Sequence, residues 1–134
     1  MRLTQIDHVG IAVADLEGSV EHYRRIFGIE PTHRERIDDQ GVEEVLFDVG
    51  ASSIQLLGSL GADTPVGRFL DTRGPGVHHV AYRVDDVADA LDDLRANGVR
   101  LVDEAPRAGS RGTRIAFVHP KGTGGVLVEL VEEP

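Results

Sequence analysis

The sequence predicts an α+β protein in which a βαβββ unit occurs twice. Residues 6–16 closely match residues 77–87, and the apolar run at 53–57 matches the run at 127–131. Between the two copies, residues 58–76 are rich in Gly and Pro, as is typical of a linker. We therefore expect one domain over 1–134, with a first repeat at about 5–58, a linker with a short helix at about 59–75, and a second repeat at about 76–132.

Each element of the first repeat follows from local patterns. Residues 6–13 alternate and are rich in Val and Ile, which predicts a strand. Asp15 is suited to cap a helix that Gly28 ends, because apolar residues follow Asp15 at helical spacing. Thr64 and Pro65 have the cap and first-turn pattern of the short linker helix. Further strands are predicted at 32–37, 42–49 and 53–57.

The second repeat follows the same order. A strand at 77–84 precedes a helix that Asp85 or Asp86 caps and that Asn97-Gly98 ends. Three more strands are predicted at about 99–103, 113–118 and 125–131. Two such units facing each other predict a cupped, half-open mixed β-sheet with the helices on the outside.

Composition and charge restrict the classes of partner. With a net charge of −9 the chain is not expected to bind nucleic acid, because phosphate binding needs a basic face. There is no Cys, no apolar run of membrane-spanning length and no signal-like start, so we expect a cytoplasmic protein with no membrane partner. A site for an anion would need a local basic cluster, and the candidates are Arg107, Arg111, Arg114 and Lys121.

The two repeats carry polar residues at equivalent positions. His8 aligns with His79 at an offset of 71, and Gln55 aligns with Glu129 at an offset of 74. If a pseudo-twofold axis relates the repeats, two imidazoles, an amide oxygen and a carboxylate converge, and this donor set suits a divalent metal ion. Each position by itself also fits an ordinary polar strand residue.

Strand alternation places one carboxylate among these residues. In the strand at 42–49, Val45 and Phe47 should face the helix, which leaves Glu44 on the opposite, inner face and Glu43 on the outer one. Asp48 shares the face of Glu44 and is the second candidate carboxylate.

Several stretches together resemble the methylmalonyl-CoA epimerase family of the vicinal oxygen chelate superfamily. They span almost the whole chain and lie at 6–13, 40–45, 54–57, 76–86, 114–121 and 125–130. The resemblance implies the vicinal oxygen chelate fold, a homodimer, and metal ligands at His8, Gln55, His79 and Glu129. It implies Glu44 and Glu129 as the two proton-transfer groups, and cobalt as the ion, with manganese, zinc or nickel as alternatives.

The activity so implied is isomerisation of an acyl-CoA through an enolate. One base removes the C2 proton of methylmalonyl-CoA, and a second returns a proton to the opposite face. With Gln55 neutral, the two His and Glu129 around a dication leave a net charge of +1, which suits a dianionic chelating substrate. Lys121 is a candidate contact for the substrate carboxylate or a CoA phosphate, and equally fits a solvated Lys.

Three other functions share this fold. A glyoxalase I-like isomerase of a glutathione hemithioacetal would use the same metal chemistry, but its bacterial form has an acidic residue where this chain has Gln55. An extradiol dioxygenase is disfavoured, since a fourth protein ligand would crowd the positions that its substrates need. A metal-free binding protein of this fold would present an aromatic groove, whereas aromatic residues make up 4% of this chain and Trp is absent.

Overall fold

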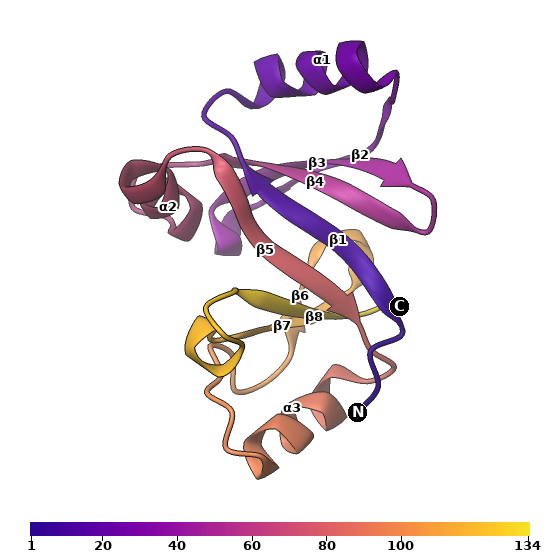
Figure 1. The fold of residues 1–134 in the computed structure, drawn as a ribbon, viewed down its shortest axis with the longest axis vertical. Helices are drawn as coiled ribbons and strands as arrows, with labels where there is room; N and C mark the ends of the chain where they lie inside the picture. Colours follow the sequence, from indigo (N-terminus) through magenta and orange to yellow (C-terminus); the bar gives the residue numbers. More distant parts are fainter. The chain divides into compact units, whose positions relative to one another are not determined.

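The computed structural model describes all 134 residues and contains three α-helices and eight strands (Figure 1). The helices are α1 (Leu16–Phe27), α2 (Pro65–Arg73) and α3 (Val87–Ala96). The strands are β1 (Gln5–Ala12), β2 (Pro31–Ile37), β3 (Val42–Val49), β4 (Ser52–Ser59), β5 (Gly76–Arg83), β6 (Arg107–Ala108), β7 (Arg114–Val118) and β8 (Val128–Glu132). No helix is both long enough and apolar enough to cross a membrane.

This order of elements confirms the predicted α+β class with two βαβββ repeats. The chain forms two compact units: a first unit of residues 9–78, and a second unit of residues 1–8 and 79–134. The unit boundaries fall within β1 and β5, so the first residues of β1 belong with the second repeat. The expectation of one domain over 1–134 stays a prediction.

In the first unit, α1 packs on one face of the strands β2, β3 and β4 (Figure 1). The helix begins at the predicted cap, where Asp15 Oδ1 accepts a hydrogen bond from the Gly18 amide at 3.1 Å, and it ends at Gly28 with φ 64°. Tyr23 of α1 stacks on Phe47 of β3 within an apolar cluster. The predicted alternation is therefore confirmed, because Val45 and Phe47 face this helix.

The opposite face of the same strands carries polar groups. In the antiparallel pairing of β3 with β4, Leu46 lies opposite Gln55 and Glu44 lies opposite Leu57. Directly opposite residues share a face, so Glu44 and Gln55 lie on one face as diagonal neighbours. Leu57 there packs with Val66 of α2, whose cap Thr64 accepts the Gly67 amide at 3.0 Å as predicted.

In the second unit, β5 pairs in parallel with β8, and β8 pairs antiparallel with β7. Helix α3 packs against β7 and β8 through Val87 and Leu91. Asp86, one of the two predicted caps, accepts the amide of Asp89 at 2.9 Å. The mixed pairing confirms the mixed sheet and places β5 and β8, which are distant in sequence, side by side.

Two predicted strands of the second repeat differ from the structure. Residues 99–103 form only one bridge, Leu101 to Val118, because the side chain of Asp103 takes the Phe117 amide at 2.8 Å that a continuing ladder would use. The last strand begins at Val128 rather than at 125, since Gly124 and Gly125 adopt positive φ angles of 73° and 99°. The glycine-rich stretch at 122–125 therefore forms a turn.

Candidate metal centre and active site

Three side chains of the second unit meet at their ligand atoms. His8 Nε2 lies 3.1 Å from His79 Nε2 and 2.9 Å from Glu129 Oε1, and the distance from His79 Nε2 to Glu129 Oε1 is 3.2 Å. All three residues are buried, with exposed fractions of 3–5%. The structure thus brings together three of the four predicted metal ligands.

Strand pairing explains how two of these side chains, His79 and Glu129, meet. Ala81 of β5 lies opposite Glu129 of β8, and Glu129 lies opposite Phe117 of β7. His79 is two residues before Ala81, so it points to the same face. Its ring packs edge-on against Phe117 with the ring centres 5.6 Å apart, and the small side chain of Ala81 leaves room beside it.

The triad fits a divalent metal ion. Ligand atoms about 2.1 Å from an ion and at right angles to one another lie about 3 Å apart, which is the spacing of these three atoms. Two imidazole nitrogens and one carboxylate oxygen suit borderline ions such as cobalt, zinc, nickel or manganese, and they leave further coordination positions open. His8, His79 and Glu129 form a group that could hold a metal, and the donors leave its identity open.

The charges of the triad are strongly coupled. Burial opposes the charged form of His8, but its hydrogen bonds to Asp7 and Glu129 raise its pKa from 6.5 to about 9. Burial alone would raise the pKa of Glu129, yet its hydrogen bonds to His79 and His8 lower the value to about 2. The metal-free site therefore favours a protonated His8 beside an ionised Glu129, and a metal ion has to displace that proton.

Asp7 is a neighbour of the triad that the sequence did not reveal. Its carboxylate is buried and accepts hydrogen bonds from His8 Nδ1 at 2.7 Å, Arg83 Nη2 at 2.7 Å and Arg111 Nη2 at 3.0 Å. Burial opposes its charge, but these hydrogen bonds and the nearby arginine charges hold its pKa well below the usual range. The only sequence signal is an acidic residue inside an apolar strand, which demands partners.

The first unit holds the other two predicted site residues. Glu44 is fully buried and Gln55 is 6% exposed, on the same face of β3 and β4. The carbonyl oxygen Oε1 of Gln55 is buried and has no hydrogen-bond partner, an unusual state for a polar atom inside a protein. Such an acceptor is suited to receive a ligand atom or a metal ion.

The competing carboxylates of β3 lie elsewhere. Glu43 is on the face of α1, where Arg34 Nε donates to its Oε2 at 2.8 Å. Asp48 is exposed near the end of the strand and accepts from Thr32 Oγ1 at 3.1 Å. Alternation therefore separates the adjacent pair as predicted, and Glu44 is the buried member. Its catalytic role stays a prediction.

The predicted basic cluster does not form a free anion site. Arg107 pairs with Asp103 at 3.3 Å, Arg111 with Asp7 at 3.0 Å, and Arg114 with Glu132 at 3.5 Å. Only the side chain of Lys121 remains exposed without a carboxylate partner, in the turn after His119. Clustering in the sequence was misleading because distant carboxylates neutralise three of the four cations.

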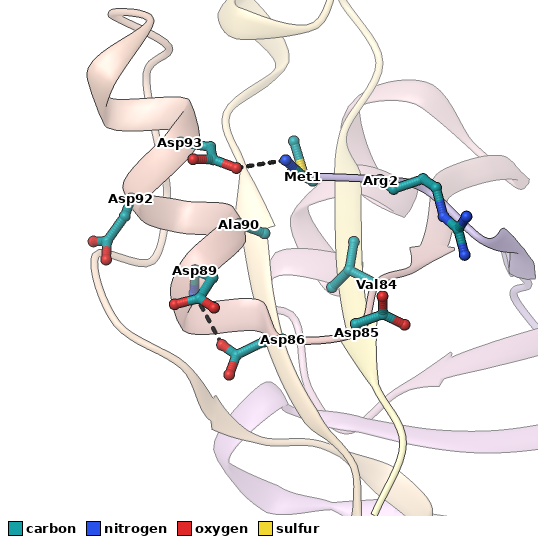
Figure 2. Close-up of a pocket in the computed structure, with 9 residues that line it drawn as sticks. All are labelled: Met1, Arg2, Val84, Asp85, Asp86, Asp89, Ala90, Asp92 and Asp93. Atoms are coloured by element: carbon teal, nitrogen blue, oxygen red, sulfur yellow. Dashed lines mark hydrogen bonds and ion pairs between the residues drawn. The ribbon is translucent and has the colours of Figure 1, made fainter.

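Figure 2 shows a pocket of about 510 Å³ in the second unit that contains none of the triad residues. It is lined by Met1, Arg2, Val84, Asp85, Asp86, Asp89, Ala90, Asp92 and Asp93. The amino terminus of Met1 forms an ion pair with Asp93 at 2.6 Å, which leaves four other aspartates around the pocket. Asp92 is also paired, with Arg95 at 2.8 Å, but the other three carboxylates outnumber Arg2 and repel phosphates, so this pocket does not suit the polyanionic tail of CoA.

Comparison with known proteins places the chain in a family. Residues 7–117 match the Glyoxalase/Bleomycin resistance protein/Dioxygenase superfamily. A crystal structure of methylmalonyl-CoA epimerase from Mycobacterium tuberculosis is 47% identical, superposes with a TM-score of 0.95, and the alignment covers 98% of this chain and 89% of that one. The chain belongs to the methylmalonyl-CoA epimerase family of this superfamily.

Two further relatives of the family carry ligand or substrate information. A methylmalonyl-CoA epimerase solved in complex with methylmalonyl-CoA and ammonium is 45% identical, with a TM-score of 0.95 over 98% of this chain and 96% of that one. The ethylmalonyl-CoA/methylmalonyl-CoA epimerase of Cereibacter sphaeroides is 36% identical over 94% of this chain and 96% of its own length. Both matches span nearly the whole chain, so the family's fold is present in full.

Proposed function

We propose that this protein is an isomerase that interconverts the two C2 epimers of methylmalonyl-CoA with a bound divalent metal ion. The observation that carries the catalytic part is the convergence of His8, His79 and Glu129, whose buried ligand atoms lie 2.9–3.2 Å apart. The substrate part rests on membership of the epimerase family. A metal-free binding protein of the same fold would have no use for three coupled, buried donors.

We propose Gln55 as the fourth ligand. Its carbonyl oxygen is buried without a hydrogen-bond partner, and a neutral donor leaves the centre with a net charge of +1. When bound, the ion supplies Lewis-acid stabilisation of the charge that develops on the thioester oxygen as the C2 proton leaves. Cobalt is our first choice, and manganese, zinc and nickel remain alternatives that the same donors accept.

Glu44 and Glu129 are the proposed proton-transfer groups. Ionised Glu44 removes the C2 proton from one face of the substrate and becomes protonated. Glu129, after taking up a proton from solvent, delivers that proton to the other face and returns to its ionised form. In the reverse direction the two groups exchange roles, because the same barrier is crossed backwards. Support for Glu44 comes from its complete burial in the middle of β3, on the same face as Gln55.

The remaining assignments concern a substrate contact, the oligomeric state and the location in the cell. Lys121 is exposed and without a carboxylate partner, so we propose it as the contact for the substrate carboxylate or a CoA phosphate. A homodimer follows from the habit of the family and from the need to cover sheet edges. We propose a cytoplasmic location, with which the absence of Cys agrees.

Proton NMR in heavy water tests the reaction directly. The cobalt-loaded protein is given methylmalonyl-CoA, and the intensity of the C2 proton signal is followed against an EDTA-treated sample. We expect metal-dependent loss of that signal. If the metal is bound but no exchange occurs, the epimerase proposal is wrong, and conversion of a glutathione hemithioacetal becomes the assay to run.

A further inference from the structure

The carboxylate of Asp7 contacts His8, a proposed metal ligand, at Nδ1, the ring nitrogen that does not face the triad. Its side chain is 1% exposed, and Oδ2 lies 2.7 Å from His8 Nδ1, on the side of the ring away from the Nε2 atom that faces His79 and Glu129. Oδ1 accepts two hydrogen bonds from Arg83, from Nη2 at 2.7 Å and from Nε at 3.3 Å. Both oxygens are therefore engaged.

We propose that Asp7 is a positioning residue for the metal centre. A neutral imidazole carries its proton on one nitrogen, and an acceptor beside Nδ1 keeps the proton there. Nε2 of His8 is then free of its proton and is held in the orientation that a metal ion needs. This inference rests on the proposed metal, but it assigns to Asp7 a task that none of the ligands performs.

Two arginines hold Asp7 in place for this task. Arg83 comes from β5 and also pairs with Glu133 at 2.7 Å, whereas Arg111 comes from the turn at 110–112 and reaches Oδ2 at 3.0 Å. A buried carboxylate without such partners would be costly and mobile. With them, its two oxygens are fixed from two directions, and the orientation of His8 follows from that of Asp7.

The backbone of Arg111 supports the same assignment. It is the one non-glycine residue of the chain with a positive φ, at φ 55° and ψ 30°. A side chain in this left-handed region is disfavoured, and such a conformation persists where other contacts fix it. A glycine at this position would avoid the strain but could not make the contact with Asp7. The strained conformation therefore coincides with a side chain that contacts Asp7, the residue hydrogen-bonded to His8.

Cobalt binding separates a positioning role from a purely structural one. The dissociation constant is measured by competition with a chelator, the visible spectrum of bound cobalt is recorded, and the melting temperature is taken without metal. For Asp7→Ala we expect 10–100-fold weaker cobalt binding and a changed spectrum, the usual range for loss of such a partner. Asp7→Asn should lie between, because an amide oxygen still accepts from Nδ1.

Two further variants keep the test decisive. Arg111→Gly removes the guanidinium but suits the positive φ, so the gain in backbone conformation offsets part of the lost ion pair. We expect only a small fall in the melting temperature of the metal-free protein, while cobalt binding weakens several-fold. Glu132→Gln is the matched control, because Glu132 of β8 loses its ion pair with Arg114 of β7 but points away from the triad. It should bind cobalt as the unmodified protein does.

Two results would overturn this inference in distinguishable ways. If Asp7→Asn and Arg111→Gly both keep the cobalt affinity and spectrum of the unmodified protein, whatever their melting temperatures, then Asp7 and its arginine partners have only a structural role. Failure of the unmodified protein to bind cobalt, manganese, zinc or nickel would remove the proposed metal centre itself, and with it any task for Asp7.

Discussion

The two units use the same repeat for different chemistry. The second unit gathers charged donors, and each of His8, His79 and Glu129 contacts the other two. The first unit instead presents a neutral amide, Gln55, at the position that corresponds to Glu129, with a buried carboxylate, Glu44, on the same face. One unit holds three donors that could bind a cation, and the other holds an unsatisfied acceptor and a candidate base.

This difference teaches that duplication fixes position but not charge. Equivalent strand positions face the same way in both repeats because side chains alternate with a period of two. A glutamate in both copies would have lowered the net charge of the proposed site from +1 to zero. Under the proposed function, the amide at Gln55 preserves the position and would leave the proposed centre positive for a dianionic substrate.

The largest expected effect tests the second unit alone. His79→Ala should abolish both cobalt binding and C2 exchange, because it removes one of three converging donors. His78→Ala is the matched control, since this neighbour packs on Phe69 with the ring centres 5.1 Å apart and does not belong to the triad. Metal analysis by mass spectrometry and the NMR assay measure the outcome. Full metal occupancy in His79→Ala would refute the ligand set.

The next effect tests the contribution of the first unit. Glu44→Gln should retain cobalt but slow C2 exchange of the epimer whose proton Glu44 removes by about 10²–10⁴-fold, the usual contribution of a general base, and epimerisation should be lost with it. Glu43→Gln, which affects the adjacent carboxylate paired with Arg34, should exchange at the normal rate. Exchange rates and cobalt affinities of both variants are compared with those of the unmodified protein. Normal turnover by Glu44→Gln would exclude Glu44 as a base.

Replacing Gln55, the proposed neutral ligand, makes the two units more alike. Gln55→Glu should bind cobalt more tightly, because a second carboxylate replaces an amide. It should also slow exchange about tenfold, or about 1.4 kcal/mol, since a less positive centre stabilises the enolate less. Chelator competition and NMR give the two values. Unchanged affinity would show that Gln55 does not reach the metal.

A smaller, graded effect is expected from pH. The pKa of His8 is raised from 6.5 to about 9 in the metal-free fold, so this interaction stabilises the fold fully below pH 6.5 and is lost as the pH rises through 9. Metal binding has the opposite trend, because cobalt competes with that proton, and affinity should rise about tenfold per pH unit up to pH 9. Thermal melts without metal and cobalt titrations over this range measure both. A pH-independent cobalt affinity would contradict the protonated state of His8.

Local rules predicted what lies within one strand or helix. The choice of Glu44 over Glu43 and the caps at Asp15 and Thr64 depend only on near neighbours, and their faces and hydrogen bonds agree with the structure. The pairing of His8 with His79 was predictable because the repeat itself encodes it.

Contacts between distant residues were beyond these rules. Asp7 meets Arg83 and Arg111 across 76 and 104 positions, and nothing in the neighbourhood of Asp7 indicates either partner. The missing strand at 99–103 has the same cause, since Asp103 takes the amide of Phe117 from 14 residues away. The identity of the metal is hidden for another reason: the same three donors accept several ions.

The parallel pairing of β5 with β8 has a kinetic consequence. The first and last ligands of the triad, His8 and Glu129, are 121 residues apart in the chain, so the complete set exists only after the most distant segments have paired. A metal ion that needs all three cannot help the early steps of folding, where local contacts form first. A bound ion should therefore leave the refolding rate almost unchanged. It should slow unfolding instead, because it stabilises only the completed fold.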